Sequence, residues 1–102
     1  MVSVLRDNRT AIVELCARFG VARLDVFGSA LRDDYRPGES DLDLLVEFQP
    51  MEPRDLADAY FGLLDGLRDL IGARLDLVMA DAVKNRIIAA EIERTRQLFY
   101  AA

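Results

Sequence analysis

Three aspartates are the residues of this sequence whose type and spacing could do chemistry. Asp41 and Asp43 stand two residues apart in an alternating apolar segment, and Asp76 stands in a later segment of the same kind. Side chains two apart on a strand share a face, and neighbouring strands lie about 4.8 Å apart, so the three carboxylates can meet. Such a cluster repels itself unless a cation neutralises it, and Mg²⁺ takes a few carboxylates together with water and phosphate oxygens. The spacing therefore predicts a magnesium site with all three aspartates as ligands.

The chemistry that such a site favours is in-line displacement at phosphorus. Two metal ions about 4 Å apart can clamp both the attacking and the leaving oxygen. We expect Asp41 and Asp43 to bridge two Mg²⁺ ions, and Asp76 to hold the ion that activates the incoming hydroxyl. Because the chain contains no histidine, a metal-bound hydroxyl or Asp76 itself must accept the proton. The three aspartates are thus predicted to be catalytic as well as metal-binding.

A candidate anion site precedes the aspartates. Gly28 and Ser29 follow an alternating segment and open a predicted short helix. Glycine lets the backbone approach a phosphate closely, and the serine hydroxyl and free N–H groups at a helix start bind anionic oxygens. Arg32, one turn later, could reach the same anion with its forked donors. Ser29 could equally cap the helix, a role compatible with phosphate binding.

The elements that must position these residues follow from hydrophobic periodicity. The pattern predicts helices over 4–19, 53–72 and 84–100, with Asp81 as a cap of the last, and strands over 23–27, 41–48 and 74–79. One face of the strands is apolar and the other carries the aspartates, so helices should cover only one face. The predicted fold is an α/β (α+β) single domain over residues 1–102, with a small mixed sheet that has helices on one face. Its core should contain alternating strand residues and helix stripes, among them Leu24, Val26, Leu42, Leu44, Val46, Phe48, Leu75, Leu77, Met79, Leu63, Leu64, Leu67, Leu70, Ile71, Ile88, Ile92, Leu98 and Phe99.

Composition excludes several classes of protein. The formal net charge is −5 and the basic residues are scattered, so direct nucleic-acid binding through a Lys/Arg face is not expected. The N-terminus lacks a signal-peptide layout and no apolar run approaches about 18 residues, so we expect a cytoplasmic protein with no membrane segment. The single cysteine, Cys16, lies on an apolar helix face and is expected to be a core thiol.

Two segments of the sequence resemble a known signature. Phe27-Gly28-Ser29-Ala30-Leu31-Arg32, followed by Ser40-Asp41-Leu42-Asp43-Leu44-Leu45-Val46, is similar to the motif of polymerase-beta-like nucleotidyltransferases, and most of all to the minimal (MNT-type) members. The resemblance covers essentially the whole chain and implies the nucleotidyltransferase fold. It also implies an antitoxin that transfers AMP from ATP to a tyrosine of a HEPN-type ribonuclease toxin, with Gly28, Ser29, Arg32 and Ser40 binding the nucleotide.

The sequence departs from that family pattern at two points and leaves two other functions open. Arg32-Asp33-Asp34 stands where the minimal family usually has Arg-Gly-Asp, and the loop from Tyr35 to Ser40 is about one residue longer than the commonest form. We expect these departures to affect triphosphate affinity and not metal binding by the aspartates. A non-catalytic antitoxin that neutralises its toxin by binding alone is one alternative. A small-molecule nucleotidyltransferase of the aminoglycoside-modifying type is the other, and it ranks lower because those enzymes usually add a second domain or dimerise.

Overall fold

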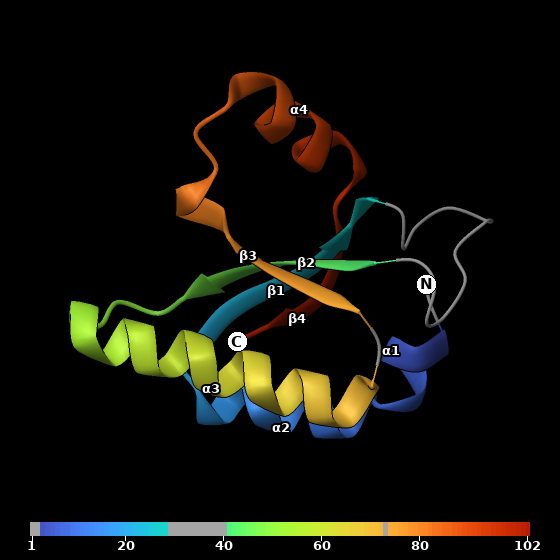
Figure 1. The fold of residues 1–102 in the computed structure, drawn as a ribbon, viewed down its shortest axis with the longest axis vertical. Coiled ribbons are helices and arrows are strands. Elements are labelled where there is room, and N and C mark those ends of the chain that lie inside the picture. Colours follow the sequence, from blue (N-terminus) through green and yellow to red (C-terminus); the bar gives the residue numbers. More distant parts are fainter. Residues whose placement is uncertain (1–2, 29–40, 73) are drawn as a thin grey trace.

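The chain folds into a four-stranded mixed sheet flanked by helices (Figure 1). The computed structural model describes residues 3–28, 41–72 and 74–102. Within them, β2 and β3 pair in parallel, β1 pairs antiparallel with β2 and with β4, and the strand order is β3-β2-β1-β4. The elements are α1 (Ser3–Asp7), α2 (Arg9–Arg18), β1 (Val21–Phe27), β2 (Leu42–Phe48), α3 (Pro53–Ile71), β3 (Leu75–Met79), the 3₁₀ turn η2 (Ala80–Ala82), α4 (Arg86–Thr95) and β4 (Gln97–Ala101).

One face of the sheet is buried under α2 and α3 (Figure 1). The alternating apolar residues predicted for this face lie in or against a single core, which confirms the predicted strand faces. Cys16 on α2 belongs to that core, and burial raises the pKa of its thiol to about 12. A thiol with so high a pKa is almost entirely neutral at pH 7, so Cys16 is a packing residue rather than a nucleophile.

Helix α3 supplies the largest part of the helical cover. It begins with Pro53 at its first turn, where the missing N–H costs nothing, and ends at Gly72, whose φ of 63° is left-handed. Between them an apolar stripe faces the sheet, formed by Ala59, Leu63, Leu64, Leu67 and Ile71. Leu70, which the pattern placed on this stripe, is instead 36% exposed at the margin of the helix.

Truncating a leucine of this stripe should destabilise the chain. Leu64 is buried in the core cluster, so Leu64→Ala removes transfer free energy and leaves a cavity. We expect the free energy of unfolding in urea to fall by about 2–5 kcal/mol. Leu70→Ala on the same helix is the matched control and should cost less than about 1 kcal/mol because that side chain is partly solvated. Equal losses in the two variants would contradict this assignment of the core.

The C-terminal segment differs from the predicted helix over 84–100. Helix α4 ends at Thr95, and the last residues form β4, which pairs along the free edge of β1. The pairing satisfies backbone groups that an unpaired β1 edge would expose to solvent. Ile88 and Leu98, expected in the core, are 54% and 51% exposed. The cap is Asn85, whose side chain accepts from the N–H groups of the first turn of α4, and not Asp81.

The second face of the sheet is partly covered by α4, so the prediction of helices on one face only was incomplete (Figure 1). Leu45 alternates with the core residues of β2 and points to this second face, yet it is buried. It lines a small hollow together with Ile92 and Arg96, which come from the helix and its C-terminal end. An apolar residue on the second face therefore needs the cover that α4 provides.

A buried ion pair fixes α4 to the sheet. Asp25 is fully buried, and its carboxylate accepts hydrogen bonds from Arg96 and, at 2.9 Å, from Arg23. Burial lowers the pKa of the Arg96 guanidinium, but hydrogen bonds to Glu93 and Asp25 outweigh burial, so the pKa is raised. Arg96 and Asp25 are therefore structural residues.

Removing Arg96 should destabilise the fold. Arg96→Ala leaves the buried Asp25 carboxylate with Arg23 as its remaining described arginine partner, and an undercompensated buried charge is costly. We expect a loss of about 3 kcal/mol in the free energy of unfolding at pH 7. Arg94→Ala, two residues earlier in an exposed pair with Glu91, should change it by about 1 kcal/mol or less. A small effect in both variants would mean that the Asp25 pair does not hold α4.

Candidate active site

The strand register brings two of the predicted aspartates together. Asp43 of β2 is the direct partner of Asp76 in the parallel pairing of β2 with β3. Partners in a parallel register point to the same face of the sheet, and adjacent strands lie about 4.8 Å apart. Asp43 is half-buried and Asp76 is exposed. The structure thus places two carboxylates side by side at the amino ends of two neighbouring strands.

Gly28 lies against Asp43 on the β1 side, opposite the side on which Asp76 lies. The pairing of β1 with β2 ends at Phe27 and Asp43, and Gly28 follows directly. A Cβ atom at Gly28 would lie 2.5 Å from Oδ2 of Asp43, and the backbone φ is +70°. Glycine is therefore required here for two reasons: its φ is left-handed, and the carboxylate occupies the space of a side chain. The backbone of this turn and the carboxylate of Asp43 share one small region, as a phosphate and its metal ion would require.

Asp41 lies at the same end of the sheet, just before β2. Its Oδ1 pairs with Nε of Arg74 at 3.0 Å. The backbone N–H of Leu42 donates to the carbonyl of Arg74 at 2.8 Å, which fixes the two segments next to each other. Asp41 and Asp76 both line an open cavity of about 600 Å³, whose other walls are Arg68, Gly72, Arg74 and Leu75. The cavity falls within the size range of small-molecule sites.

The donor set fits a divalent cation, although the three carboxylates do not converge on one point. Over residues 3–28, 41–72 and 74–102, no three acidic, cysteine or histidine side chains are gathered closely enough to hold a metal ion together. Asp43 and Asp76 are neighbours in the strand register, Asp76 and Asp41 line the same cavity, and Asp41 forms an ion pair with Arg74. The assignment of Asp41, Asp43 and Asp76 as metal ligands and catalytic residues stays a prediction.

Three other predicted residues fall outside the described structure. Ser29, Arg32 and Ser40 lie within residues 29–40, as does the short helix expected after Gly28. Their roles as nucleotide-binding residues stay predictions. Arg74 and Arg68, which both line the cavity of Asp41 and Asp76, have no role predicted from the sequence. The signal that could have placed Arg74 was its position two residues before Asp76, at the entry to the same strand.

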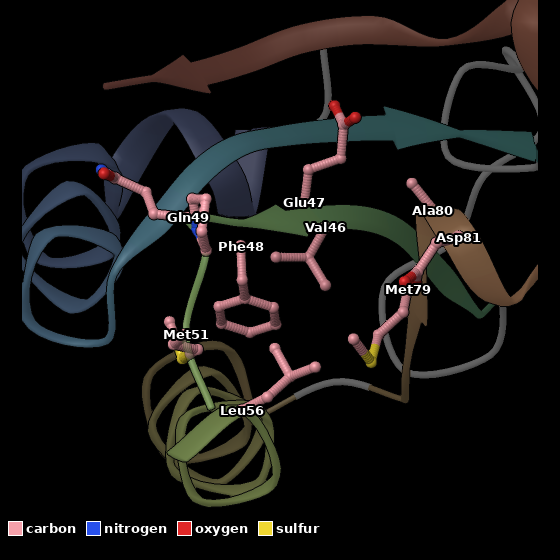
Figure 2. Close-up of a pocket in the computed structure, with 10 residues that line it drawn as sticks. Val46, Glu47, Phe48, Gln49, Met51, Leu56, Met79, Ala80 and Asp81 are labelled. Atoms are coloured by element: carbon pink, nitrogen blue, oxygen red, sulfur yellow. The ribbon is translucent and has the colours of Figure 1, made fainter. Parts of the chain in front are cut away.

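A second cavity lies at the other end of the sheet. Figure 2 shows its lining at the carboxyl ends of β2 and β3, where Val46, Phe48, Leu56 and Met79 supply apolar walls. Its volume is about 280 Å³, and Glu47 and Asp81 are among its other lining residues. The predicted metal ligands lie at the amino ends of the same strands, so this cavity is separate from the candidate active site.

Comparison with known proteins decides the family. The family described as "Nucleotidyltransferase domain" matches residues 9–98. The chain belongs to this family. The nucleotidyltransferase is 40% identical over 74 residues to protein adenylyltransferase MntA of Thermococcus cleftensis, covering 72% of this chain and 71% of that protein. It is 37% identical over 90 residues to MJ0128 of Methanocaldococcus jannaschii, which carries a protein adenylyltransferase name, covering 88% and 85% of the two chains.

Solved structures agree with this family assignment. A structure described as a minimal nucleotidyltransferase superposes on this nucleotidyltransferase with a TM-score of 0.68 and 34% identity, covering 95% of both chains. A toxin–antitoxin structure with AMP-PNP has the same TM-score at 16% identity, covering 93% of this chain and 74% of that one, which shows the shared fold alone. The resemblance to minimal nucleotidyltransferases, the enzyme class and the mixed α/β fold are thereby confirmed. Among the described residues, no helix is long and apolar enough to cross a membrane.

Proposed function

We propose that this nucleotidyltransferase is a magnesium-dependent antitoxin that transfers AMP from ATP to a tyrosine of a HEPN-type ribonuclease toxin. The observation that carries the proposal is the pairing of Asp43 with Asp76 beside Gly28, at one end of the sheet. Two relatives at 37% and 40% identity carry protein adenylyltransferase names, and a toxin–antitoxin structure with AMP-PNP has the same fold. We place the reaction in the cytoplasm, where ATP is available.

The strand order suggests how two substrates would meet. Gly28 lies on the β1 side of Asp43, and Asp76 lies on its β3 side, which is an edge of the sheet. In our proposal the α-phosphate of ATP lies beside Gly28, where the backbone can approach it closely, and the rest of the triphosphate reaches past Asp43 toward the cavity lined by Asp41 and Arg74. The acceptor tyrosine approaches from the open β3 edge, in line with the bond to pyrophosphate. A second substrate that is a folded protein would bring much of its own binding surface to so small an enzyme.

The transfer forms one bond and breaks one. The tyrosine oxygen bonds to the α-phosphorus of ATP, the bond to the β-phosphate oxygen breaks, and pyrophosphate leaves with the electron pair. Asp41, Asp43 and Asp76 would hold Mg²⁺, which when bound supplies Lewis-acid stabilisation of the charge on the phosphoryl oxygens. Asp76 is the exposed carboxylate nearest the open edge, so it is the group of this chain best placed to accept the tyrosine proton.

Labelled ATP tests the proposal directly. The partner to use is the product of the neighbouring reading frame, provided that it carries the Arg-x4–6-His pattern of HEPN nucleases. Incubation with Mg²⁺ should transfer label from α-labelled but not γ-labelled ATP, and EDTA or a tyrosine-to-phenylalanine toxin should prevent it. If the toxin is inhibited without ATP and without the aspartates, AMP transfer is ruled out as the mechanism, and the chain neutralises its toxin by binding alone.

A further inference from the structure

Arg74 brings a positive charge to one of the predicted metal ligands. Its Nε lies 3.0 Å from Oδ1 of Asp41, one of the three predicted metal ligands. The position is set by the backbone, since the Arg74 carbonyl accepts from the N–H of Leu42 immediately after Asp41. The pairing of the two segments therefore places the backbone of Arg74 beside Asp41, within reach of the guanidinium.

The ion pair is easily exchanged. The Arg74 side chain is 65% exposed and the Asp41 side chain is 54% exposed. Ion pairs with this much solvent contribute little to stability, because water and salt screen them. A divalent ion that also gains ligands from neighbouring carboxylates and from phosphate oxygens should bind Asp41 more strongly than one guanidinium does.

The displaced guanidinium would still lie close to the substrates. Arg74 lines the same open cavity as Asp41 and Asp76, and Arg68 from the last turns of α3 lines it as well. An arginine fork suits the oxygens of a phosphate, and the ATP of the proposed reaction carries several. The Arg74 side chain can thus pair with the Asp41 carboxylate before a metal ion binds, and contact the nucleotide afterwards.

We propose that Arg74 is a resident counter-ion that holds Asp41 until a divalent ion displaces it, and that the released guanidinium then binds an anionic oxygen of the nucleotide. Arg74 is a positioning residue for Asp41 in the first state and a nucleotide contact in the second. This inference rests on the proposed function, because it takes Asp41 to be a metal ligand and ATP to be the substrate.

Titration with Mn²⁺ in the absence of nucleotide tests the first state. Arg74→Ala should bind Mn²⁺ about two- to fivefold more tightly than the wild type, the ratio that matches the strength of an exposed ion pair. Arg68→Ala is the control for charge, since it removes one positive charge from the same cavity, and it should tighten binding less. Arg54→Ala is the neutral control, at the first turn of α3 and about 21 Å along the helix from Arg68.

The outcomes separate this inference from the proposed function. Wild-type binding that Arg74→Ala fails to tighten, or tightens only as much as Arg68→Ala does, overturns the inference and leaves the metal site intact. Absence of Mn²⁺ binding in both the wild type and Arg74→Ala overturns the inference together with the metal assignment. Weaker Mn²⁺ binding in Arg74→Ala would mean that the arginine only orients Asp41, which also overturns it.

Kinetics at saturating Mg²⁺ test the second state. Arg74→Ala should raise KM for ATP several-fold with kcat little changed, because the lost contact is to the bound nucleotide. Arg74→Lys should recover part of the KM, since it keeps the charge and loses the fork. A fall in kcat at unchanged KM would contradict the nucleotide contact.

Discussion

Replacing Asp41 and Asp43 together by asparagine is expected to abolish AMP transfer and leave the chain folded. Both side chains are at least partly solvated at the end of β2, so neither is part of the core. The amides keep the shape of the carboxylates but remove the two negative charges that would hold the divalent ions. We expect transfer to fall by at least about 10³-fold, the upper end of the cost of removing one preorganised electrostatic group.

The fold of this double variant is the first thing to measure. The ion pair of Asp41 with Arg74 is exposed, so its loss should change the free energy of unfolding by about 1 kcal/mol or less. Relief of repulsion among the carboxylates offsets part of that change. Asp58→Asn with Asp65→Asn removes the same charge from the exposed side of α3 and should keep full activity. Transfer that survives in the Asp41 and Asp43 double variant would rule out the metal assignment.

Alanine at Gly28 is expected to have the second largest effect on transfer. The left-handed backbone costs about 1–2 kcal/mol for a residue with a Cβ atom. The added methyl group would also lie 2.5 Å from Oδ2 of Asp43, a distance at which one of the two groups must move. Because Asp43 and Asp76 are neighbours in the strand register, moving the Asp43 carboxylate would separate the two predicted ligands. We expect transfer to fall by about 10²-fold or more, the scale that follows from a misplacement of about 1 Å at a reacting centre.

Gly20→Ala separates the cost of the backbone from the displacement of Asp43. Gly20 has a φ of +71°, nearly that of Gly28, and lies between α2 and β1. Its added methyl group would meet only the terminal methyl of Met51 at 3.1 Å, which belongs to a flexible side chain. Both variants should lose similar stability in thermal unfolding, but only Gly28→Ala should lose transfer. Equal activities in the two variants would show that the contact with Asp43 has no catalytic consequence.

The central strands and α3 could be predicted from sequence because their information is local. Alternation at Leu42, Leu44 and Val46 assigns the two faces of β2, and the same parity assigns Asp43 to the face opposite the core. The C-terminal strand could not be predicted in this way. Leu98, Phe99 and Tyr100 form a short apolar run that fits the end of a helix as well as a strand. The segment becomes a strand because the edge of β1 is open for pairing, and a local sequence pattern carries no information about that edge.

The candidate site likewise has features that follow from local sequence and features that depend on contacts between distant segments. The types and parity of the aspartates predicted which side chains would share a face, and the register of Asp43 with Asp76 agrees with that. The contact of Arg74 with Asp41 depends on which residues of two distant strands lie opposite each other. The pairing of Arg96 with Asp25 likewise depends on the direction in which α4 returns over the sheet. Such pairs follow from tertiary structure and are not encoded at a fixed spacing.

The parallel pairing of β2 with β3 makes the proposed active site depend on complete folding. Asp43 and Asp76 flank α3 in the sequence, so they become neighbours only when that helix has docked and carried the chain back to the same end of the sheet. A chain emerging from the ribosome therefore carries scattered carboxylates with little affinity for a shared ion until β3 is synthesised and in place. Ligands that bind only the assembled arrangement also draw the equilibrium toward it, so the magnesium and nucleotide of the proposed reaction should protect the newly synthesised protein from proteolysis.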